Sequence, residues 1–193
     1  SDLNNSNINI WSDLSGNAQH LLQSSADKQP KLNTYNSKHY ISFDGSNDSL
    51  GKDINGHVLD NPTGKNVTVF TVVRPINDSG SSYILSTGGQ TGSAVGYALG
   101  FSSGTGFSVL KDTSGGKLIN IDEPFKKNIT NLVTHSYKGS YSNYENLVNG
   151  KQVTSLIQNY SGASNGHTML TVGRPNNGES YYGQFQIAEI VVL

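Results

Sequence analysis

Residue types that support enzyme chemistry occur in this 193-residue chain, but they stand in no catalytic pattern. The segment 100–104 reads Gly-Phe-Ser-Ser-Gly, which matches the G-x-S-x-G motif of serine hydrolases. That motif places its serine on a strand-to-helix turn, and no helical pattern follows this segment. The chain has no cysteine, which excludes a cysteine nucleophile and a zinc site made of thiolates. These residues predict that the chain is not an enzyme.

Side chains that ligate metals are spread along the chain rather than clustered. The five histidines are His20, His39, His57, His135 and His167. No two of them stand in metal-ligand spacing, so we expect them at surface or loop positions. Asp44 and Asp48 offer oxygen atoms to a calcium ion, but the EF-hand pattern is absent and turn capping also accounts for both. We therefore expect no cofactor, with calcium at these two residues as the alternative.

Aromatic and amide side chains that suit ligand binding gather in two segments, 135–146 and 175–182. The residues that we expect to contact a ligand are Tyr137, Tyr141, Asn143, Tyr144, Asn176, Asn177 and Tyr181. Tyrosine offers a flat apolar face and a hydroxyl group, while Asn and Ser supply adaptable hydrogen bonds. This mixture suits sugar rings, and it also suits protein surfaces. The alternative is that these tyrosines are ordinary strand residues with their hydroxyl groups in solvent.

Short apolar runs must position these side chains, and the runs are rich in β-branched and aromatic residues. Turn signals separate them about every 8 to 15 residues, which is typical of all-β proteins. Asn149-Gly150 suits the type I′ turn of a hairpin between 144–148 and 151–153. A single helical turn is expected at 17–23. The pattern predicts one domain over residues 1–193, an antiparallel sandwich of two β-sheets with about 12 to 14 strands.

The composition is polar but carries little charge, which excludes several partners. Charged residues make up 14% of the chain and the net charge is −1, so the basic stripe of a nucleic-acid-binding surface is missing. No apolar run approaches the roughly 18 residues of a membrane span, so no membrane insertion is expected. The chain begins at Ser1 without a methionine or an apolar leader, which predicts a processed chain or a domain of a larger protein.

Six short segments follow one another in a characteristic order. They read W-S-D-L-S-G-N at 11–17, F-D-G-S-N-D-S-L at 43–50, V-F-T-V at 69–72, V-N-G at 148–150, V-G-R at 172–174 and Y-G-Q-F-Q-I-A-E-I at 182–190. Together they resemble the laminin-G-like jelly-roll domains of the concanavalin A-like lectin/glucanase superfamily. The resemblance implies a jelly-roll sandwich. It says less about function, because this fold hosts lectins, polysaccharide-cleaving enzymes, adhesion modules and spacers.

The resemblance also directs attention to carboxylates. Glucan-cleaving members of the superfamily carry paired carboxylates as E-x-D-x-x-E on one strand, where they flank the scissile bond. The four glutamates of this chain are Glu123, Glu145, Glu179 and Glu189. None stands in that motif, which argues against a glycosidase of this type. Glu189 lies in an apolar strand pattern, so we expect it to pair with Arg74 or Arg174.

These observations predict a non-catalytic carbohydrate-binding or adhesion module of a larger secreted, cell-surface or virion protein. Its expected partner is a glycan or a cell-surface receptor, held by Tyr, Asn and Ser side chains on loops. Two alternatives stay open. A protein-binding adhesion or fibre-tip domain would show self-association or an apolar patch on one sheet face. A polysaccharide-active enzyme would need a pocket with two or more close carboxylates.

Overall fold

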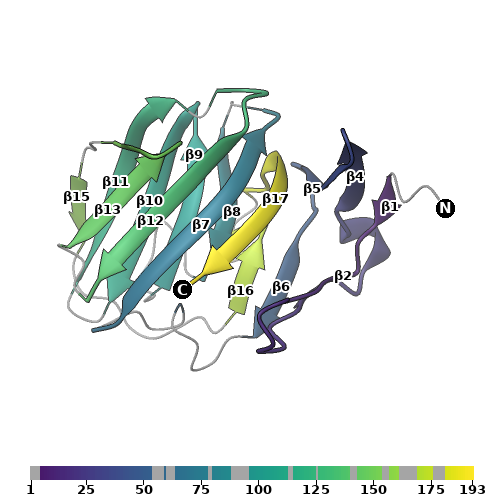
Figure 1. Cartoon of the computed structure of the whole chain (residues 1–193), viewed down its shortest axis with the longest axis horizontal. Helices are drawn as coiled ribbons and strands as arrows, with labels where there is room; N and C mark the ends of the chain where they lie inside the picture. The colour runs from purple at the N-terminus through teal and green to yellow at the C-terminus, as the bar shows by residue number, and fades with distance from the viewer. Residues whose placement is uncertain are drawn as a thin grey trace.

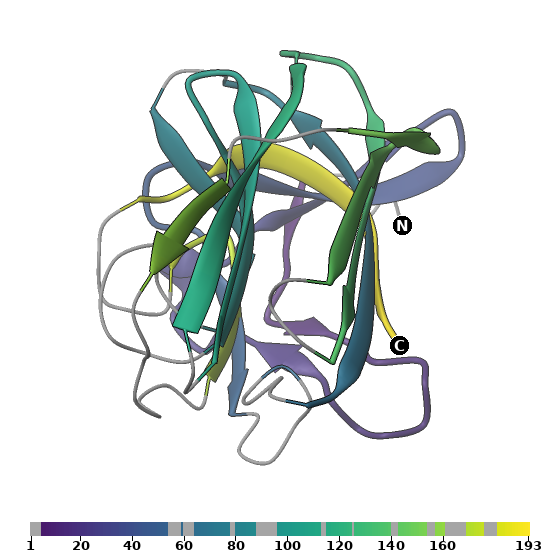
Figure 2. The same cartoon turned by 90° about the vertical axis from the view of Figure 1, so that its left-hand side faces the viewer.

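Two antiparallel β-sheets face each other and enclose the core between them (Figures 1 and 2). The computed structural model describes residues 5–53, 59, 64–77, 80–87, 96–112, 115–124, 126–139, 143–153, 157–160, 169–175 and 181–193. Every strand pair in these ranges is antiparallel, as the turn-rich sequence predicts. The predicted two-sheet sandwich is confirmed.

The described residues form 17 strands. In chain order these are β1 (Ser6–Asn7), β2 (Ile10–Trp11), β3 (Leu21–Leu22), β4 (Lys31–Tyr35), β5 (Lys38–Asp44), β6 (Leu50–Asp53), β7 (Asn66–Pro75), β8 (Ser81–Ser86), β9 (Gly96–Ser102), β10 (Thr105–Asp112), β11 (Gly115–Pro124), β12 (Asn131–Lys138), β13 (Tyr144–Val148), β14 (Lys151–Gln152), β15 (Ile157–Tyr160), β16 (Met169–Val172) and β17 (Gln184–Val192). The strands β1, β2, β3 and β14 have two residues each, which explains why the number exceeds the expected 12 to 14.

Strands that are distant in sequence lie side by side in both sheets. The eight-stranded sheet has the order β1-β4-β5-β17-β7-β12-β13-β14, and the nine-stranded sheet has the order β15-β11-β10-β9-β8-β16-β6-β3-β2. The last strand, β17, is thus inserted between β5 and β7. Because the chain crosses repeatedly between the sheets, side chains far apart in sequence meet on one surface.

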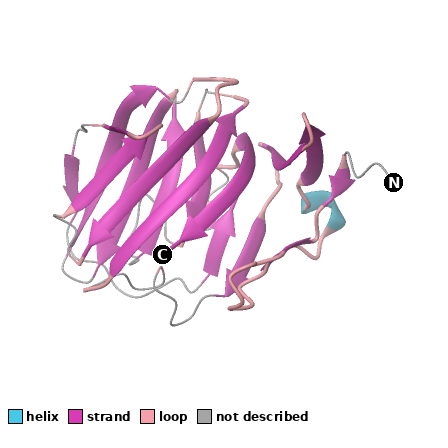
Figure 3. Ribbon diagram, viewed as in Figure 1, coloured by secondary structure: helices cyan, strands magenta, loops and turns pink. Residues whose placement is uncertain are grey.

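Two local predictions had different outcomes. The hairpin at Asn149-Gly150 is present: Val148 pairs with Lys151, and both turn residues have positive φ, 53° and 79°. The helical turn expected at 17–23 is absent: residues 17–20 form a loop in which the Asp13 carboxylate accepts a hydrogen bond from the backbone N–H of Gln19, and Leu21–Leu22 form strand β3. The described part instead has one 3₁₀ turn, η1 (Ala26–Lys28) (Figure 3).

The main core lies between the sheets and follows from strand alternation. In β7, every second side chain from Val67 to Val73 points inward, while the residues between them are only half-buried. Phe185 of β17 stacks on Phe43 of β5, with ring centroids 4.8 Å apart, and both side chains are buried. Each buried aromatic side chain of this kind contributes about 1.5–3 kcal/mol to folding.

A β-bulge interrupts this alternation in β17. Ile187 pairs with Val73, and Glu189 pairs with the next residue, Val72, so that Ala188 is the extra residue. The bulge turns Glu189 to the outer face of the sheet, where its side chain is exposed. A carboxylate in that position needs no buried partner.

The ion pair expected for Glu189 is therefore wrong. In the part of the chain that the structure describes, Arg74 instead donates hydrogen bonds to the carbonyl oxygen of Asn128 (3.1 Å) and to Oε1 of Gln186 (3.3 Å). Arg174 has a buried Nε atom without a hydrogen-bond partner.

A polar cluster is buried between the sheets, contrary to the expectation that the histidines lie at surface or loop positions. His135 of β12 is 1% exposed, and its ring stacks on Tyr97 of β9 with centroids 5.2 Å apart. Asn146, which pairs with His135 across β12 and β13, accepts a hydrogen bond from the hydroxyl group of Ser108 at 3.4 Å. Burial lowers the pKa of His135 to about 4, so its ring is neutral at pH 7.

Candidate functional site

The structure describes two of the three tyrosines of segment 137–144, Tyr137 and Tyr144. Tyr137 shares the inward face of β12 with His135; it is 2% exposed and belongs to the core, which does not fit the predicted ligand contact. Its neighbour across the strands, Tyr144, is half-buried, and Asn143 is exposed. Tyr141 lies outside the described residues. Strand alternation explains the outcome, because Tyr137 falls on the buried face.

Tyr181 lies elsewhere, in the segment that precedes β17, and it packs against the nine-stranded sheet. Its ring stacks on Tyr83 of β8 with centroids 6.5 Å apart, and Tyr83 in turn meets the edge of Phe107 at 5.3 Å. Tyr83 is fully buried, whereas Tyr181 is 48% exposed. Asn176 and Asn177, predicted beside it, lie outside the described residues. Tyr181 thus packs against β8 of the nine-stranded sheet, whereas Tyr144 is a residue of β13 in the eight-stranded sheet.

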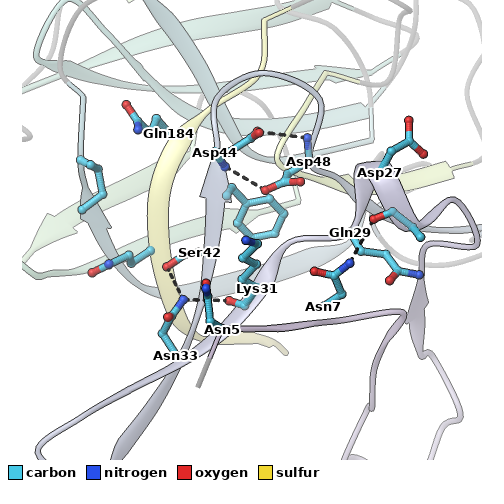
Figure 4. Close-up of a pocket in the computed structure, with 14 residues that line it drawn as sticks. Asn5, Asn7, Asp27, Gln29, Lys31, Asn33, Ser42, Asp44, Asp48 and Gln184 are labelled. Atoms are coloured by element: carbon cyan, nitrogen blue, oxygen red, sulfur yellow. Dashed lines mark hydrogen bonds between the residues drawn. The ribbon is translucent and has the colours of Figure 1, made fainter. Parts of the chain in front are cut away.

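The described part of the chain contains an open groove of about 570 Å³ at the end of the eight-stranded sheet. We call it the amide groove, because six of its lining side chains are amides: Asn5, Asn7, Gln29, Asn33, Gln184 and Gln186. Three carboxylates, those of Asp27, Asp44 and Asp48, and the ammonium group of Lys31 also line it. Figure 4 shows Lys31 between Asn33 and Ser42 on one side and Asn7, Asp27 and Gln29 on the other.

Cross-strand register positions one wall of the amide groove. Lys31 of β4 pairs with Ser42 of β5, and Ser42 pairs with Gln186 of β17, so the three side chains form a row on the outer face of the sheet. The facing wall comes from β1 and η1, which are tied together by a hydrogen bond from Nδ2 of Asn7 to the carbonyl oxygen of Ala26 (3.2 Å). Five separate elements thus build this surface.

A tight loop closes one end of the amide groove, and two aspartates hold it in shape. Oδ1 of Asp44 accepts hydrogen bonds from the backbone N–H groups of Ser46 (2.8 Å) and Asn47 (3.2 Å), and Oδ2 of Asp48 accepts one from the N–H of Asp44 (2.9 Å). The predicted turn capping by Asp44 is confirmed. The described residues contain no group of three or more acidic or histidine side chains suited to a metal ion.

Glycine is required in this loop for two reasons. Gly45 has a φ of +80°, a conformation that other residues rarely adopt. A Cβ atom at this position would also lie 2.8 Å from the Cβ atom of Gln184 on the neighbouring strand β17. The loop can therefore lie directly against β17, which brings Asp44 and Gln184 to the same end of the groove.

The charges of the amide groove are mostly negative. Burial, together with the charge of Asp44, raises the pKa of Asp48 to about 6, while the N–H of Asp44 and the charge of Lys31 act in the opposite direction. At pH 7 the lining therefore carries three carboxylates against one ammonium group.

Some of the amides are engaged and others are free to bind. Nδ2 of Asn33 donates to Oγ of Ser42 (3.1 Å), and Nε2 of Gln29 donates to the carbonyl oxygen of Gln23 (2.8 Å). The side-chain amides of Asn5 and Gln184 have no hydrogen-bond partner within the described ranges. A side-chain amide both donates and accepts hydrogen bonds, as a sugar hydroxyl group does.

Sequence reasoning missed the amide groove because no local segment carries its pattern. Its lining residues are spread along the sequence from Asn5 to Gln186. They come together in the folded chain, where β17 lies beside β5. A weak signal was the excess of amide and hydroxyl side chains over charged ones. Composition alone does not say where such residues gather.

The chain matches no protein-family model, and no curated protein matches it. Its fold is similar to solved structures of botulinum neurotoxin binding domains. The receptor-binding domain of botulinum neurotoxin D gives a TM-score of 0.58 at 13% identity, over 100% of this chain and 50% of that one. None of the helices in the described part is long and apolar enough to cross a membrane.

Two further structures show the same likeness. One concerns the cell entry of botulinum neurotoxin type C, which depends on interaction with two ganglioside molecules; it gives a TM-score of 0.58 at 10% identity, over 97% of this chain and 47% of that one. The other is the binding domain of botulinum neurotoxin DC in complex with rat synaptotagmin II, with a TM-score of 0.57 at 11% identity, over 97% and 48%. The chain spans about half the length of these structures, and at such identities the likeness shows the fold alone.

Proposed function

We propose that this chain is a non-catalytic recognition module that binds a glycan in the amide groove. The observation that carries the proposal is the set of side-chain amides in an open hollow of about 570 Å³, two of which have no partner in the described structure. Amides pair well with neutral hydroxyl groups because each offers donors and an acceptor. A shallow polar site of this kind fits affinities in the millimolar to micromolar range, about 4–8 kcal/mol.

The structural likeness supports this proposal at the level of fold. The similar structures include binding domains that engage ganglioside molecules or synaptotagmin, and we extend that kind of partner, a cell-surface glycan or receptor, to this chain. We further assign the chain to the laminin-G-like branch of the concanavalin A-like sandwiches, on the six ordered sequence segments. A module of a larger extracellular, cell-surface or virion protein is the setting that fits these assignments.

A glycan array followed by titration tests the groove directly. Gln184→Ala removes a free amide, and we expect it to weaken binding of the array hit about tenfold, since one or two hydrogen bonds are lost. Gln152→Ala is the matched control: Gln152 is an exposed amide on β14, at the opposite edge of the same sheet. An array without hits, in the presence and absence of calcium, would contradict glycan binding.

The same titration separates the amide groove from the tyrosine sites. If Tyr144→Ala or Tyr181→Ala abolishes binding while Gln184→Ala does not, the ligand lies on the tyrosine surfaces and the groove assignment fails. Both tyrosines are at least partly accessible to solvent, so a ligand can reach their side chains. Circular dichroism on each variant shows whether the fold is retained.

An apolar patch supports a second candidate, a protein-binding adhesion module. Ile10, Leu22 and Met169 are exposed on the outer face of the nine-stranded sheet, where Ile10 pairs with Leu22 and Leu22 pairs with Gly51. The Met169 side chain lies over Gly51, since its Cε atom is 3.2 Å from the place of a Cβ atom there. If the patch binds a second copy of the chain, sedimentation equilibrium will show a dimer at high concentration. A monomer at every concentration would exclude self-association through this patch.

A further inference from the structure

The amide groove has an unbalanced set of charges. Asp27, on η1, is exposed and has no hydrogen-bond or ion-pair partner among the residues that the structure describes. Asp44 and Asp48 add two further carboxylates at the closed end. Lys31 stands between these groups, and its charge already acts on Asp48. A ligand that enters the groove therefore meets a net negative field.

No second cation of the described lining corrects this imbalance. The nearest arginine along the strand row is Arg74, which pairs with Gln186 one strand beyond the groove. Its guanidinium group keeps its charge but donates hydrogen bonds to Oε1 of Gln186 and the carbonyl oxygen of Asn128, and Arg74 is not among the residues that line the groove. Within the described lining, Lys31 is thus the one cationic side chain, and carboxylates outnumber it.

We propose that the amide groove selects uncharged glycans and rejects glycans that carry a carboxylate or sulfate group. This selectivity rests on the proposed function, because it concerns the same site. Hydroxyl groups of a neutral sugar can replace their hydrogen bonds to water with hydrogen bonds to the amides of Gln184 and Asn5. No charged group of the sugar loses its solvation in this exchange. An acidic sugar must instead bring its charge beside Asp27, Asp44 and Asp48 and lose solvation there, which is unfavourable.

The test is a titration with two oligosaccharides that differ only in one terminal acidic sugar. We expect the neutral one to bind several-fold tighter at low salt, and the difference to shrink between about 0.01 M and 1 M salt, where the screening length falls from roughly 30 Å to 3 Å. If the acidic oligosaccharide binds as tightly as the neutral one, the proposed selectivity is wrong, but the proposed glycan binding still holds. Binding of neither overturns both.

Variants locate the effect in the groove. We expect Asp27→Lys to raise the affinity for the acidic oligosaccharide relative to the neutral one, and Asp27→Asn to do so to a smaller extent. Glu145→Lys makes the same charge change on β13, four strands from β5, and should leave the ratio unchanged. An equal shift in Glu145→Lys and Asp27→Lys would show that total charge, rather than the groove, sets the preference, and would overturn the proposal.

Discussion

Two aspartates in capped loops show how position decides the behaviour of a carboxyl group. The pKa of Asp13 falls to about 2, because the N–H groups of Gln19 and Ser15 and the Ser15 hydroxyl group donate hydrogen bonds to its carboxylate. Asp48 also accepts an N–H hydrogen bond, yet burial and the nearby Asp44 raise its pKa to about 6. Asp13 is therefore a permanent anion at neutral pH, while Asp48 titrates within the range of mildly acidic solutions.

Asp48→Asn tests this difference. Because the folded-state pKa of Asp48 is raised, its protonation favours the folded chain; this contribution is full below pH 4 and is lost as the pH rises through 6. Asparagine keeps the acceptor for the N–H of Asp44 without the charge. We expect Asp48→Asn to be more stable than the wild type at pH 7 by about 1 kcal/mol, after allowance for solvent screening. Urea denaturation at pH 7 measures the change, and a less stable variant would contradict it.

Residue-scale features were predictable where the partners are close in sequence. The hydrogen bonds from the N–H of Ser15 to Asp13 and from the N–H of Ser46 to Asp44 both span two residues, and the sequence indicates both. The burial of His135 was not predictable in this way. It depends on Tyr97 from the opposite sheet, and no neighbour of His135 in the sequence indicates that contact.

At the scale of elements, strand alternation explains most of the structure and the bulge in β17 explains the main exception. Alternation places Phe185 and Ile187 in the core as expected, and the extra residue Ala188 then turns Glu189 outward. A bulge leaves no clear mark in a single sequence, because Ala fits either a bulge or a regular strand. The sequence therefore predicts that β17 exists but not where its pattern shifts.

The bulge leads to a prediction that reverses the sequence-based one. Glu189→Gln should change the stability by no more than about 0.5 kcal/mol, since the side chain is exposed. Ile187→Ala, two residues earlier on the buried face, should cost about 2–5 kcal/mol. Thermal unfolding of both variants under one set of conditions compares the two positions. A large loss in Glu189→Gln would mean that the charge has a structural partner.

At the scale of the whole molecule, two distant groups have opposite effects on stability as the pH changes. His135 has a lowered pKa of about 4, so the folded chain holds this ring neutral while the unfolded chain protonates it below pH 6.5. Stability from His135 is full above pH 6.5 and falls as the pH drops toward 4. The raised pKa of Asp48 acts the other way over nearly the same range. The wild type should therefore depend weakly on pH between 4 and 6.

Single variants should expose each effect. In Asp48→Asn, His135 is left unopposed, and we expect the free energy of unfolding to fall by up to about 1.4 kcal/mol for each pH unit between 6 and 4. In His135→Gln, Asp48 is left unopposed, and we expect the free energy of unfolding to rise as the pH falls from 6 to 4. Urea denaturation at half-unit steps gives these slopes. Parallel curves for the wild type and both variants would show that neither group titrates as described.

The sheet edges have a consequence for how the molecules behave toward one another. Within the described residues, three of the four edge strands, β1, β14 and β2, have two residues each, and β15 has four. A net charge of −1 provides little mutual repulsion, least of all near the isoelectric pH of about 6.5. Short edges supply the protection that charge does not, because a neighbouring chain finds too few free backbone groups to begin a fibril. We therefore attribute the resistance of this protein to aggregation to its short edge strands rather than to its net charge.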